Sequence, residues 1–222
     1  MIPTDVSTYN GITIYSHADD HYSHRVRLAL AEKEVRYQLI IVDDDMLEDV
    51  ADLNPYNQLP MLVERQLRLY HTNIILEYID ERYRQQRMLP DAPHQRAEHR
   101  QYAWRIEQDW MKLADVLLRH PDTLDAEAAR KARAGLGQSL VSLSPLFAQF
   151  PFFMSEQFGL NDCILAPMLW RLPEMGITLP VAHCKPLLAY CKRLFERPGF
   201  QASLTDMERL KHQRLKQTRL NG

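Results

Sequence analysis

Asp20 stands in a short loop where side chains able to do chemistry gather. The loop joins a predicted strand to a predicted amphipathic helix, and the hydroxyls of Ser16, Tyr22 and Ser23 lie beside it. A hydroxyl at such a place can donate a hydrogen bond that favours a thiolate, and a cysteine can act as a nucleophile. An ionised carboxylate only accepts hydrogen bonds, and its charge repels a thiolate. Asp20 therefore predicts that thiol chemistry is missing from this loop.

Other residue patterns argue against several further kinds of active site. No pair of histidines has metal-binding spacing with additional ligands, and no segment matches a P-loop, a zinc site or a Ser-His-Asp set. Three cysteines, Cys163, Cys184 and Cys191, are too few and too scattered for a disulfide framework, so we expect buried, reduced thiols. The sequence thus predicts no catalytic residue, no metal and no cofactor.

The composition is that of an ordinary globular chain with unevenly distributed charge. Of the 222 residues, 45% are apolar and 25% are charged, and no apolar run approaches the ~18 residues that cross a bilayer. The first residues contain neither a basic leader nor an apolar segment, so we expect no signal peptide and a cytoplasmic location. Residues 1–87 carry 15 acidic and nine basic side chains, whereas the remainder carries 14 and 18. An acidic first half disfavours direct nucleic-acid binding.

Hydrophobic patterns divide the chain into two halves. The first half alternates strands and helices in the order β-α-β-α-β-β-α, which is the thioredoxin-like arrangement. Its expected elements are a strand at 11–16, a helix at 23–34, a buried strand at 37–42, a short helix at 43–53, a hairpin of 61–64 and 67–70, and a helix at 72–83 capped by Thr72. The second half has no strand signal, and its expected helices cover 95–119, 125–143, 161–172 and 186–196.

These patterns predict an α/β amino-terminal domain at residues 10–88 and an all-helical carboxy-terminal domain at residues 95–210. Two prolines within a polar stretch mark residues 89–94 as a linker. Residues 211–222 are a basic tail, which we expect to be a solvated helix end. Three tryptophans in helical patterns are expected to pack in the core or between the domains: Trp104, Trp110 and Trp170.

The first half resembles the glutathione transferase family. Residues 54–63, Asn-Pro-Tyr-Asn-Gln-Leu-Pro-Met-Leu-Val, are similar to a family motif whose last proline is cis and whose preceding residue offers its backbone to glutathione. In this chain those two residues are Leu59 and Pro60. Asp20 stands at the position of the family's catalytic Ser, Cys or Tyr. His71 and Thr72 stand where Glu-Ser often holds the γ-glutamyl group, and a histidine cannot replace a carboxylate in pairing with an ammonium group. The resemblance implies a transferase-like architecture whose glutathione site is altered.

A folding motif in the second half also matches that family. Residues 153–167 resemble its capping box and hydrophobic staple, with Gly159 in place of the usual Ser or Thr cap. Asp162 keeps the position that folds back on the cap. This motif predicts a helix start and implies nothing about a substrate.

Longer blocks resemble a narrower family, stringent starvation protein A, from about residue 14 to residue 208. The blocks are residues 21–33, 78–83, 105–110, 162–173 and 200–205. That family comprises bacterial RNA polymerase-associated regulators with a transferase-like fold and no transferase activity. The resemblance implies a homodimer that binds the polymerase holoenzyme, including its sigma subunit, and changes promoter use during starvation or acid stress.

The chain departs from that family in the segment through which, by the resemblance, it would contact the polymerase. Its members commonly carry Pro-His-Pro on an exposed pocket, whereas the candidate partner-binding residues here are Tyr83, Arg84, Gln85, Gln86 and Arg87. Loss of the prolines removes a stiffened loop, and the arginines supply bidentate donors. We therefore expect that this segment contacts the polymerase in an altered way or not at all. The alternative interpretation of the segment is a solvated linker.

Two other functions stay open at this stage. A glutathione transferase or peroxidase could use Ser16, Ser23 or Tyr22 in place of the missing residue, although we expect Ser23 to cap the first helix. A sensor of a small anion such as guanosine tetraphosphate would use the basic surplus of the helical half. Arg105, Glu107 and Asp109 are either dimer contacts or surface charges.

Overall fold

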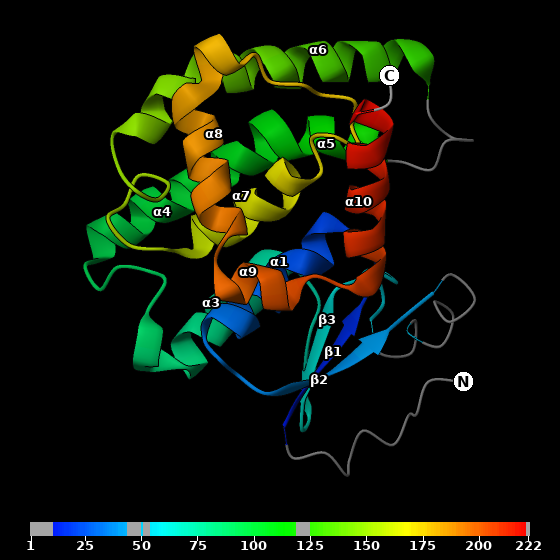
Figure 1. Ribbon diagram of the computed structural model, residues 1–222. Helices are drawn as coiled ribbons and strands as arrows, with labels where there is room; N and C mark the ends of the chain where they lie inside the picture. Colours follow the sequence, from blue (N-terminus) through cyan, green and yellow to red (C-terminus); the bar gives the residue numbers. More distant parts are fainter. Residues whose placement is uncertain (1–10, 44–49, 51–53, 119–124, 221–222) are drawn as a thin grey trace. The chain divides into compact units, whose positions relative to one another are not determined.

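The computed structural model describes residues 11–43, 50, 54–118 and 125–220, and the chain divides into two compact units (Figure 1). The first unit contains Met1–Arg87 and Pro198–Leu210, and the second contains Met88–Arg197 and Lys211–Gly222. The boundary at Arg87 agrees with the sequence. Residues 198–210, in contrast, belong to the first unit rather than to the helical domain in which the sequence placed them.

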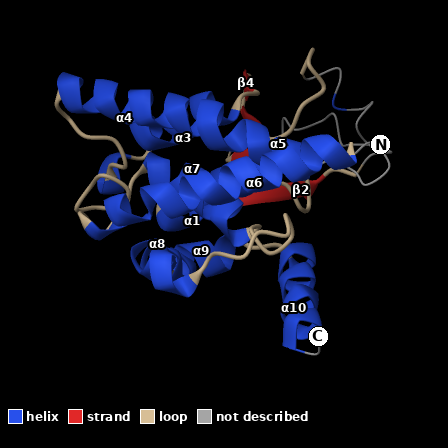
Figure 2. Cartoon of the chain, turned by 90° about the horizontal axis from the view of Figure 1, so that it is seen from above, coloured by secondary structure: helices blue, strands red, loops and turns tan. Residues whose placement is uncertain are grey.

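A four-stranded sheet with the order β2-β1-β3-β4 forms the centre of the first unit. Its strands are β1 (Ile12–Ser16), β2 (Tyr37–Ile41), β3 (Met61–Glu64) and β4 (Leu67–Leu69). The pair β1–β2 is parallel, and the pairs β1–β3 and β3–β4 are antiparallel. The helices α1 (His21–Glu32) and α3 (Thr72–Arg82) pack against each other, and Figure 2 colours these helices blue and the strands red. The predicted thioredoxin-like order is confirmed wherever the structure describes it.

Two predictions for this unit, the buried strand at residues 37–42 and the short helix at residues 43–53, were not confirmed. The strand expected to be buried, β2, lies at the edge of the sheet, and Leu39 and Ile41 remain 39% and 40% exposed. An edge strand has a neighbour on one side alone, so its apolar side chains are covered less than those of β1. The short helix predicted at residues 43–53 falls almost entirely outside the described residues.

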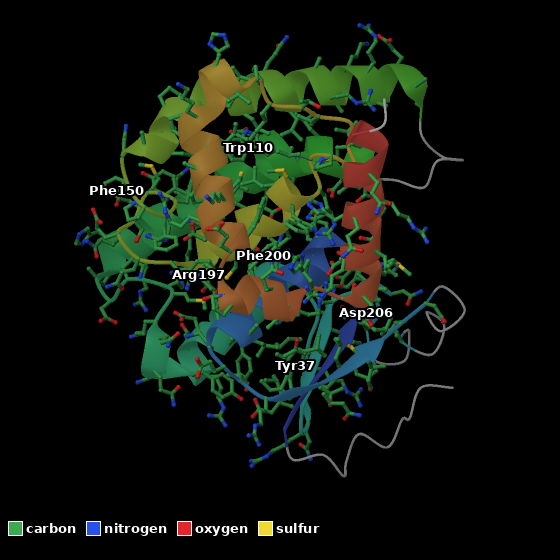
Figure 3. The ribbon with its side chains drawn as sticks, viewed as in Figure 1. Tyr37, Trp110, Phe150, Arg197, Phe200 and Asp206 are labelled. Carbon is green, nitrogen blue, oxygen red and sulfur yellow. The ribbon has the colours of Figure 1, made fainter. Side chains whose placement is uncertain are left out.

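The helix α9 (Pro198–Ser203) and the start of α10 (Asp206–Leu220) join the first unit through buried polar contacts; Figure 3 labels Phe200 and Asp206 in these helices. Arg27 of α1 donates to the Ser203 carbonyl at 3.0 Å and pairs with Glu208 at 2.7 Å, and both side chains are 1% exposed. The Glu208 carboxylate in turn accepts from the Thr205 backbone N–H, and the Thr205 hydroxyl accepts from the Glu208 N–H, which is a capping box. The Arg27 contacts link residues more than 170 positions apart, so the local sequence pattern did not reveal them.

Helices make up the second unit wherever it is described. They are α4 (Pro93–Ile106), a π-helical turn (Glu107–Met111), α5 (Lys112–Leu117), α6 (Ala126–Leu143), a 3₁₀ turn (Ser144–Ala148), α7 (Leu160–Trp170), and α8 (Val181–Phe195), which is kinked at Cys184. The basic tail continues α10 as helix to Leu220. Its Lys211 pairs with Glu174, and its His212 ring stacks on Trp170 with centroids 3.7 Å apart. Among the described helices, none combines the length and apolarity needed to span a membrane.

The half of the α7 capping box that Asp162 supplies is confirmed, whereas Gly159 has no side chain to return a hydrogen bond. The Asp162 carboxylate accepts from the backbone N–H groups of Gly159 at 2.8 Å and Phe153 at 2.9 Å, and from the Tyr190 hydroxyl at 2.6 Å. Burial raises the pKa of Asp162 to about 6, because desolvation of the carboxylate outweighs these hydrogen bonds. Asp162 therefore joins the start of α7 to Phe153 and to Tyr190 of α8 inside the helical unit.

Candidate functional site

Asp20 is the capping residue of α1. Its extended backbone (φ −125°, ψ 150°) precedes the helix, and its Oδ1 accepts from the N–H groups of Tyr22 at 2.6 Å and Ser23 at 3.0 Å. Its Oδ2 accepts from the Ser23 N–H at 3.2 Å. The positive end of the helix dipole and two of its free donors thus face the chain's own carboxylate. Our expectation that Ser23 caps this helix is wrong, because the Ser23 hydroxyl accepts instead from the His17 N–H at 3.1 Å.

Two of the three hydroxyls near this cap are buried and make hydrogen bonds within the chain. The buried Ser16 hydroxyl donates to the His17 carbonyl at 2.8 Å and accepts from Arg27 at 2.5 Å. Ser23 is also buried. Tyr22 is half-exposed, and the Arg25 guanidinium lies 4.5 Å from the centre of its ring. Of the three hydroxyls considered as substitutes for a catalytic residue, Tyr22 is the one with solvent access.

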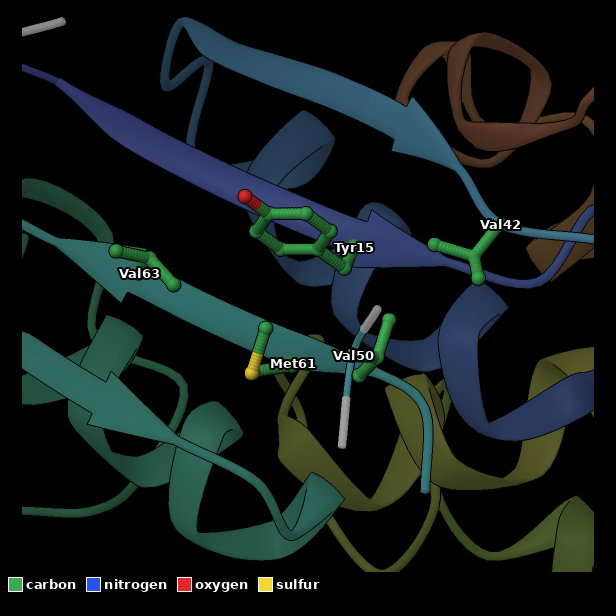
Figure 4. Close-up of a cluster of buried hydrophobic side chains, with 5 residues drawn as sticks. All are labelled: Tyr15, Val42, Val50, Met61 and Val63. Atoms are coloured by element: carbon green, nitrogen blue, oxygen red, sulfur yellow. The ribbon is translucent and has the colours of Figure 1, made fainter. Parts of the chain in front are cut away.

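The remaining positions that resemble a glutathione site have mixed outcomes. The Leu59–Pro60 peptide bond is cis, as the motif predicts. Pro60 leads directly into β3, whose Met61 and Val63 pack with Tyr15, Val42 and Val50 in one buried cluster (Figure 4).

The start of α3 does not reproduce the expected capping. His71 occupies the capping position with no side-chain hydrogen bond to the helix, and Thr72 is the first helical residue and is buried. The predicted cap at Thr72 is wrong by one position. His71 lies instead at an open cavity of about 500 Å³, where Ile74, Glu77 and Glu81 also line the wall. The carboxylates of this wall belong to Glu77 and Glu81, whereas position 71 carries an imidazole.

The candidate partner-binding residues form a defined turn after α3. Arg84–Gln86 is a 3₁₀ turn whose side chains are exposed, and Tyr83 and Arg87 on either side are half-buried. The guanidinium of Arg82 lies 5.3 Å from the centre of the Tyr83 ring and pairs with Glu64 at 3.4 Å. The segment is thus an ordered surface feature, and the loss of the prolines has not left it without structure.

A buried lysine lies beneath this turn. Lys33, the residue after α1, places its Nζ 2.8 Å from the Asp80 carboxylate, 2.7 Å from the Tyr83 carbonyl and 2.6 Å from the Gln86 carbonyl. The Lys33 and Asp80 side chains are 1% and 0% exposed. Sequence reasoning missed this contact, because nothing in the local pattern of Lys33 points to residues fifty positions away.

A second cavity lies within the helical unit, at the π-helical turn. It has a volume of about 300 Å³, and its wall is mainly apolar and aromatic, with Tyr102, Trp110 and Phe153 among its residues. Trp110 is buried and donates to the Ser139 hydroxyl at 2.8 Å, whereas Trp104 is 60% exposed, contrary to our expectation that it packs in the core or between the domains. Within the described residues, no three metal-ligating side chains cluster together.

Comparison with known proteins agrees with this fold. Residues 10–81 match the family described as the glutathione S-transferase N-terminal domain. The structure is similar to that of poplar glutathione transferase F1, with a TM-score of 0.78 and 20% identity over 91% of this chain and all of that one, a likeness that concerns the fold alone. The chain is therefore a protein of the glutathione transferase fold.

Its sequence relatives define a narrower class. The chain is 43% identical over 194 residues to the stringent starvation protein A homolog of Pasteurella multocida, a match covering 87% of this chain and 90% of the relative. The homolog of Haemophilus ducreyi is 38% identical, with 87% and 89% covered. The chain belongs to the stringent starvation protein A family.

Proposed function

We propose that this protein is a cytoplasmic, RNA polymerase-associated regulator of the starvation and stress response that has no transferase activity. The observation that supports this proposal most directly is the Asp20 carboxylate at the start of α1. It accepts hydrogen bonds from the Tyr22 and Ser23 N–H groups, which are the donors that an incoming anion would need. A thiolate brought to the same place would meet a like charge rather than a hydroxyl donor.

The same reasoning applies to the other end of a bound glutathione. His71 is exposed, makes no capping bond and cannot pair with the γ-glutamyl ammonium as a carboxylate would. The third element, the cis Leu59–Pro60 bond, matches the motif. Because Asp20 and His71 differ from the residues that hold glutathione in that family, we propose that no cofactor is bound.

The proposed polymerase contact is the turn formed by Tyr83, Arg84, Gln85, Gln86 and Arg87. Its exposed Arg84–Gln86 segment is ordered and carries a guanidinium able to bind carboxylates in a bidentate manner. The preceding helix ends here, so its dipole favours the added positive charge. A folded, cationic turn suits the holoenzyme, including its sigma subunit, as the partner.

We also propose that the protein acts as a homodimer. Ile74 on α3 is 56% exposed beside Glu77 and Glu81, and Trp104 on α4 is 60% exposed beside Arg100 and Arg105. Large apolar side chains flanked by opposite charges are typical of protein interfaces. Two copies related by a two-fold axis could pair these surfaces reciprocally.

Retention of the purified protein on RNA polymerase holoenzyme tests the main proposal. The wild type is compared with a variant in which Arg84, Gln85, Gln86 and Arg87 are replaced by alanine, and with K192M/E196Q, an exposed ion pair on α8, as the control. We expect the wild type and the control to be retained and the alanine variant to be lost. Absence of retention of the wild type would remove the polymerase role.

An enzyme assay decides the competing function. Tyr22 keeps some solvent access, so conjugation of glutathione to a chromogenic electrophile is measured for the wild type and for Y22F. We expect no conjugation above the uncatalysed rate by either protein. Conjugation by the wild type that Y22F abolishes would establish a transferase with an atypical hydroxyl.

A further inference from the structure

The contact between Lys33 and the turn after α3 uses every donor of the lysine. An ammonium group has three N–H bonds, and here one faces the Asp80 carboxylate while the other two face the carbonyls of Tyr83 and Gln86. All three distances, between 2.6 and 2.8 Å, are those of short charge-assisted hydrogen bonds. The side chain is 1% exposed, which strengthens its contact with the buried Asp80 carboxylate.

The two carbonyls bracket the 3₁₀ turn. Tyr83 immediately precedes Arg84–Gln86, and Gln86 is its last residue, so a single ammonium holds both ends of the turn. Carbonyls at a helix end lack intrahelical partners and need a donor. Asp80, one turn earlier on α3, fixes the position of the ammonium and neutralises its charge.

This arrangement supplies the rigidity that the local sequence does not. The turn contains no proline, and Arg84, Gln85 and Gln86 have flexible, exposed side chains. The Arg84 side chain makes a long contact, from its Nε to the Glu81 carbonyl at 3.4 Å. The Lys33 ammonium, in contrast, makes two short contacts that join the two ends of the turn.

We propose that Lys33 is a positioning residue for partner binding: its buried ammonium, set by Asp80, holds residues 83–86 in the conformation that the partner recognises. The proposal rests on the proposed function for its partner, but the ordering of the turn can be measured on the protein alone. Binding is strengthened when a contact segment is already in its bound conformation.

The test uses two variants, because K33M leaves Asp80 buried without its counter-charge and can fail to fold. The double variant K33M/D80N removes both charges together and keeps the shape of the Asp80 side chain. The K192M/E196Q variant, which removes an exposed lysine–glutamate pair, is the matched control. Circular dichroism first establishes that each variant has the helix content of the wild type.

Limited trypsin digestion reports the order of the turn without any partner. Cleavage after Arg84 and Arg87, followed by mass spectrometry of the fragments, is expected to be about tenfold faster in K33M/D80N, since cleavage follows the population of the open segment. Cleavage after Arg130 in α6 is expected to stay the same. Unchanged cleavage after Arg84 and Arg87 in the folded double variant overturns the proposal.

Retention on RNA polymerase holoenzyme gives the second readout. We expect retention of K33M/D80N to fall about tenfold, while the control variant is retained like the wild type. Full retention of the double variant overturns the positioning role. If the wild type itself is not retained, the proposed function fails, and the digestion still decides whether Lys33 holds the turn.

Discussion

Replacement of Asp20 by alanine tests whether its carboxylate caps α1. The carboxylate accepts three hydrogen bonds from two backbone N–H groups at the start of α1, and it places a negative charge at the positive end of the helix. Loss of a capping side chain costs about 1 kcal/mol, and loss of the charge costs about 0.3–1 kcal/mol. We expect D20A to lower the free energy of unfolding by about 1–2 kcal/mol.

Two further variants separate the terms of this prediction. D20N keeps the capping oxygen and loses the charge, so we expect it to recover most of the cap and to lose about 0.5 kcal/mol. D20S keeps a capping oxygen and restores the hydroxyl that transferases carry. The control is E156A, which removes an exposed acid outside the helices and is expected to leave stability unchanged.

Urea denaturation followed by far-ultraviolet circular dichroism measures these differences as shifts of the midpoint. The order wild type, D20N and D20S, then D20A is expected, with D20A the least stable. A D20A protein as stable as the wild type would refute the view that the carboxylate is a cap. Glutathione conjugation by the wild type that D20A lowers would refute it in a different way, because Asp20 would then act in a reaction.

Three other predictions concern separate parts of the molecule. D162N should flatten the pH dependence of stability between pH 4 and 6. Because the pKa of Asp162 is raised to about 6 in the folded state, the protonated carboxyl stabilises the fold in acid, and about 3 kcal/mol of unfolding free energy is lost as the pH rises through this range. Urea midpoints measured across the range would show the loss in the wild type and its absence in D162N. T205A should lower the unfolding free energy by about 1 kcal/mol, because the Thr205 hydroxyl both accepts from the Glu208 N–H and donates to the Ala18 carbonyl; an unchanged midpoint would contradict this role. I74E and W104E should each shift the protein from dimer to monomer in light scattering coupled to gel filtration, whereas V181E, at another exposed apolar residue, should not; dimers in both variants would place the self-contact elsewhere.

The sequence predicted most of the elements because their patterns are local. The described strands and helices of the first half, the hairpin and the bond from the α7 cap to Asp162 appeared as expected. The edge position of β2 was not predicted, because burial of a strand depends on strand order as well as on composition. The capping box of α10 was not predicted, although Thr205 and Glu208 have the required spacing.

The candidate site was predicted in part, and its errors have a common cause. Asp20 was singled out from the sequence, but its role as the cap came only with the structure, since Ser23 has an equally suitable side chain for that role. Lys33 was overlooked because its partners lie 47 to 53 residues further along the chain. Contacts of this kind depend on how elements pack, which a pattern of residue types along one segment does not specify.

Asp20 and Lys33 connect the two parts of the proposed function, the absence of transferase chemistry and the binding of a partner. Both residues end the same helix, Asp20 before its first turn and Lys33 after its last. At the first end, a resident carboxylate takes the donors that a thiolate would use. At the second end, a buried ammonium orders the turn proposed to bind the polymerase. Because each end depends on different partners, substitutions at Asp20 are expected to leave the turn intact, and loss of the Lys33 contact is expected to leave the α1 cap intact. A change in the trypsin cleavage of the turn in D20A would contradict this independence.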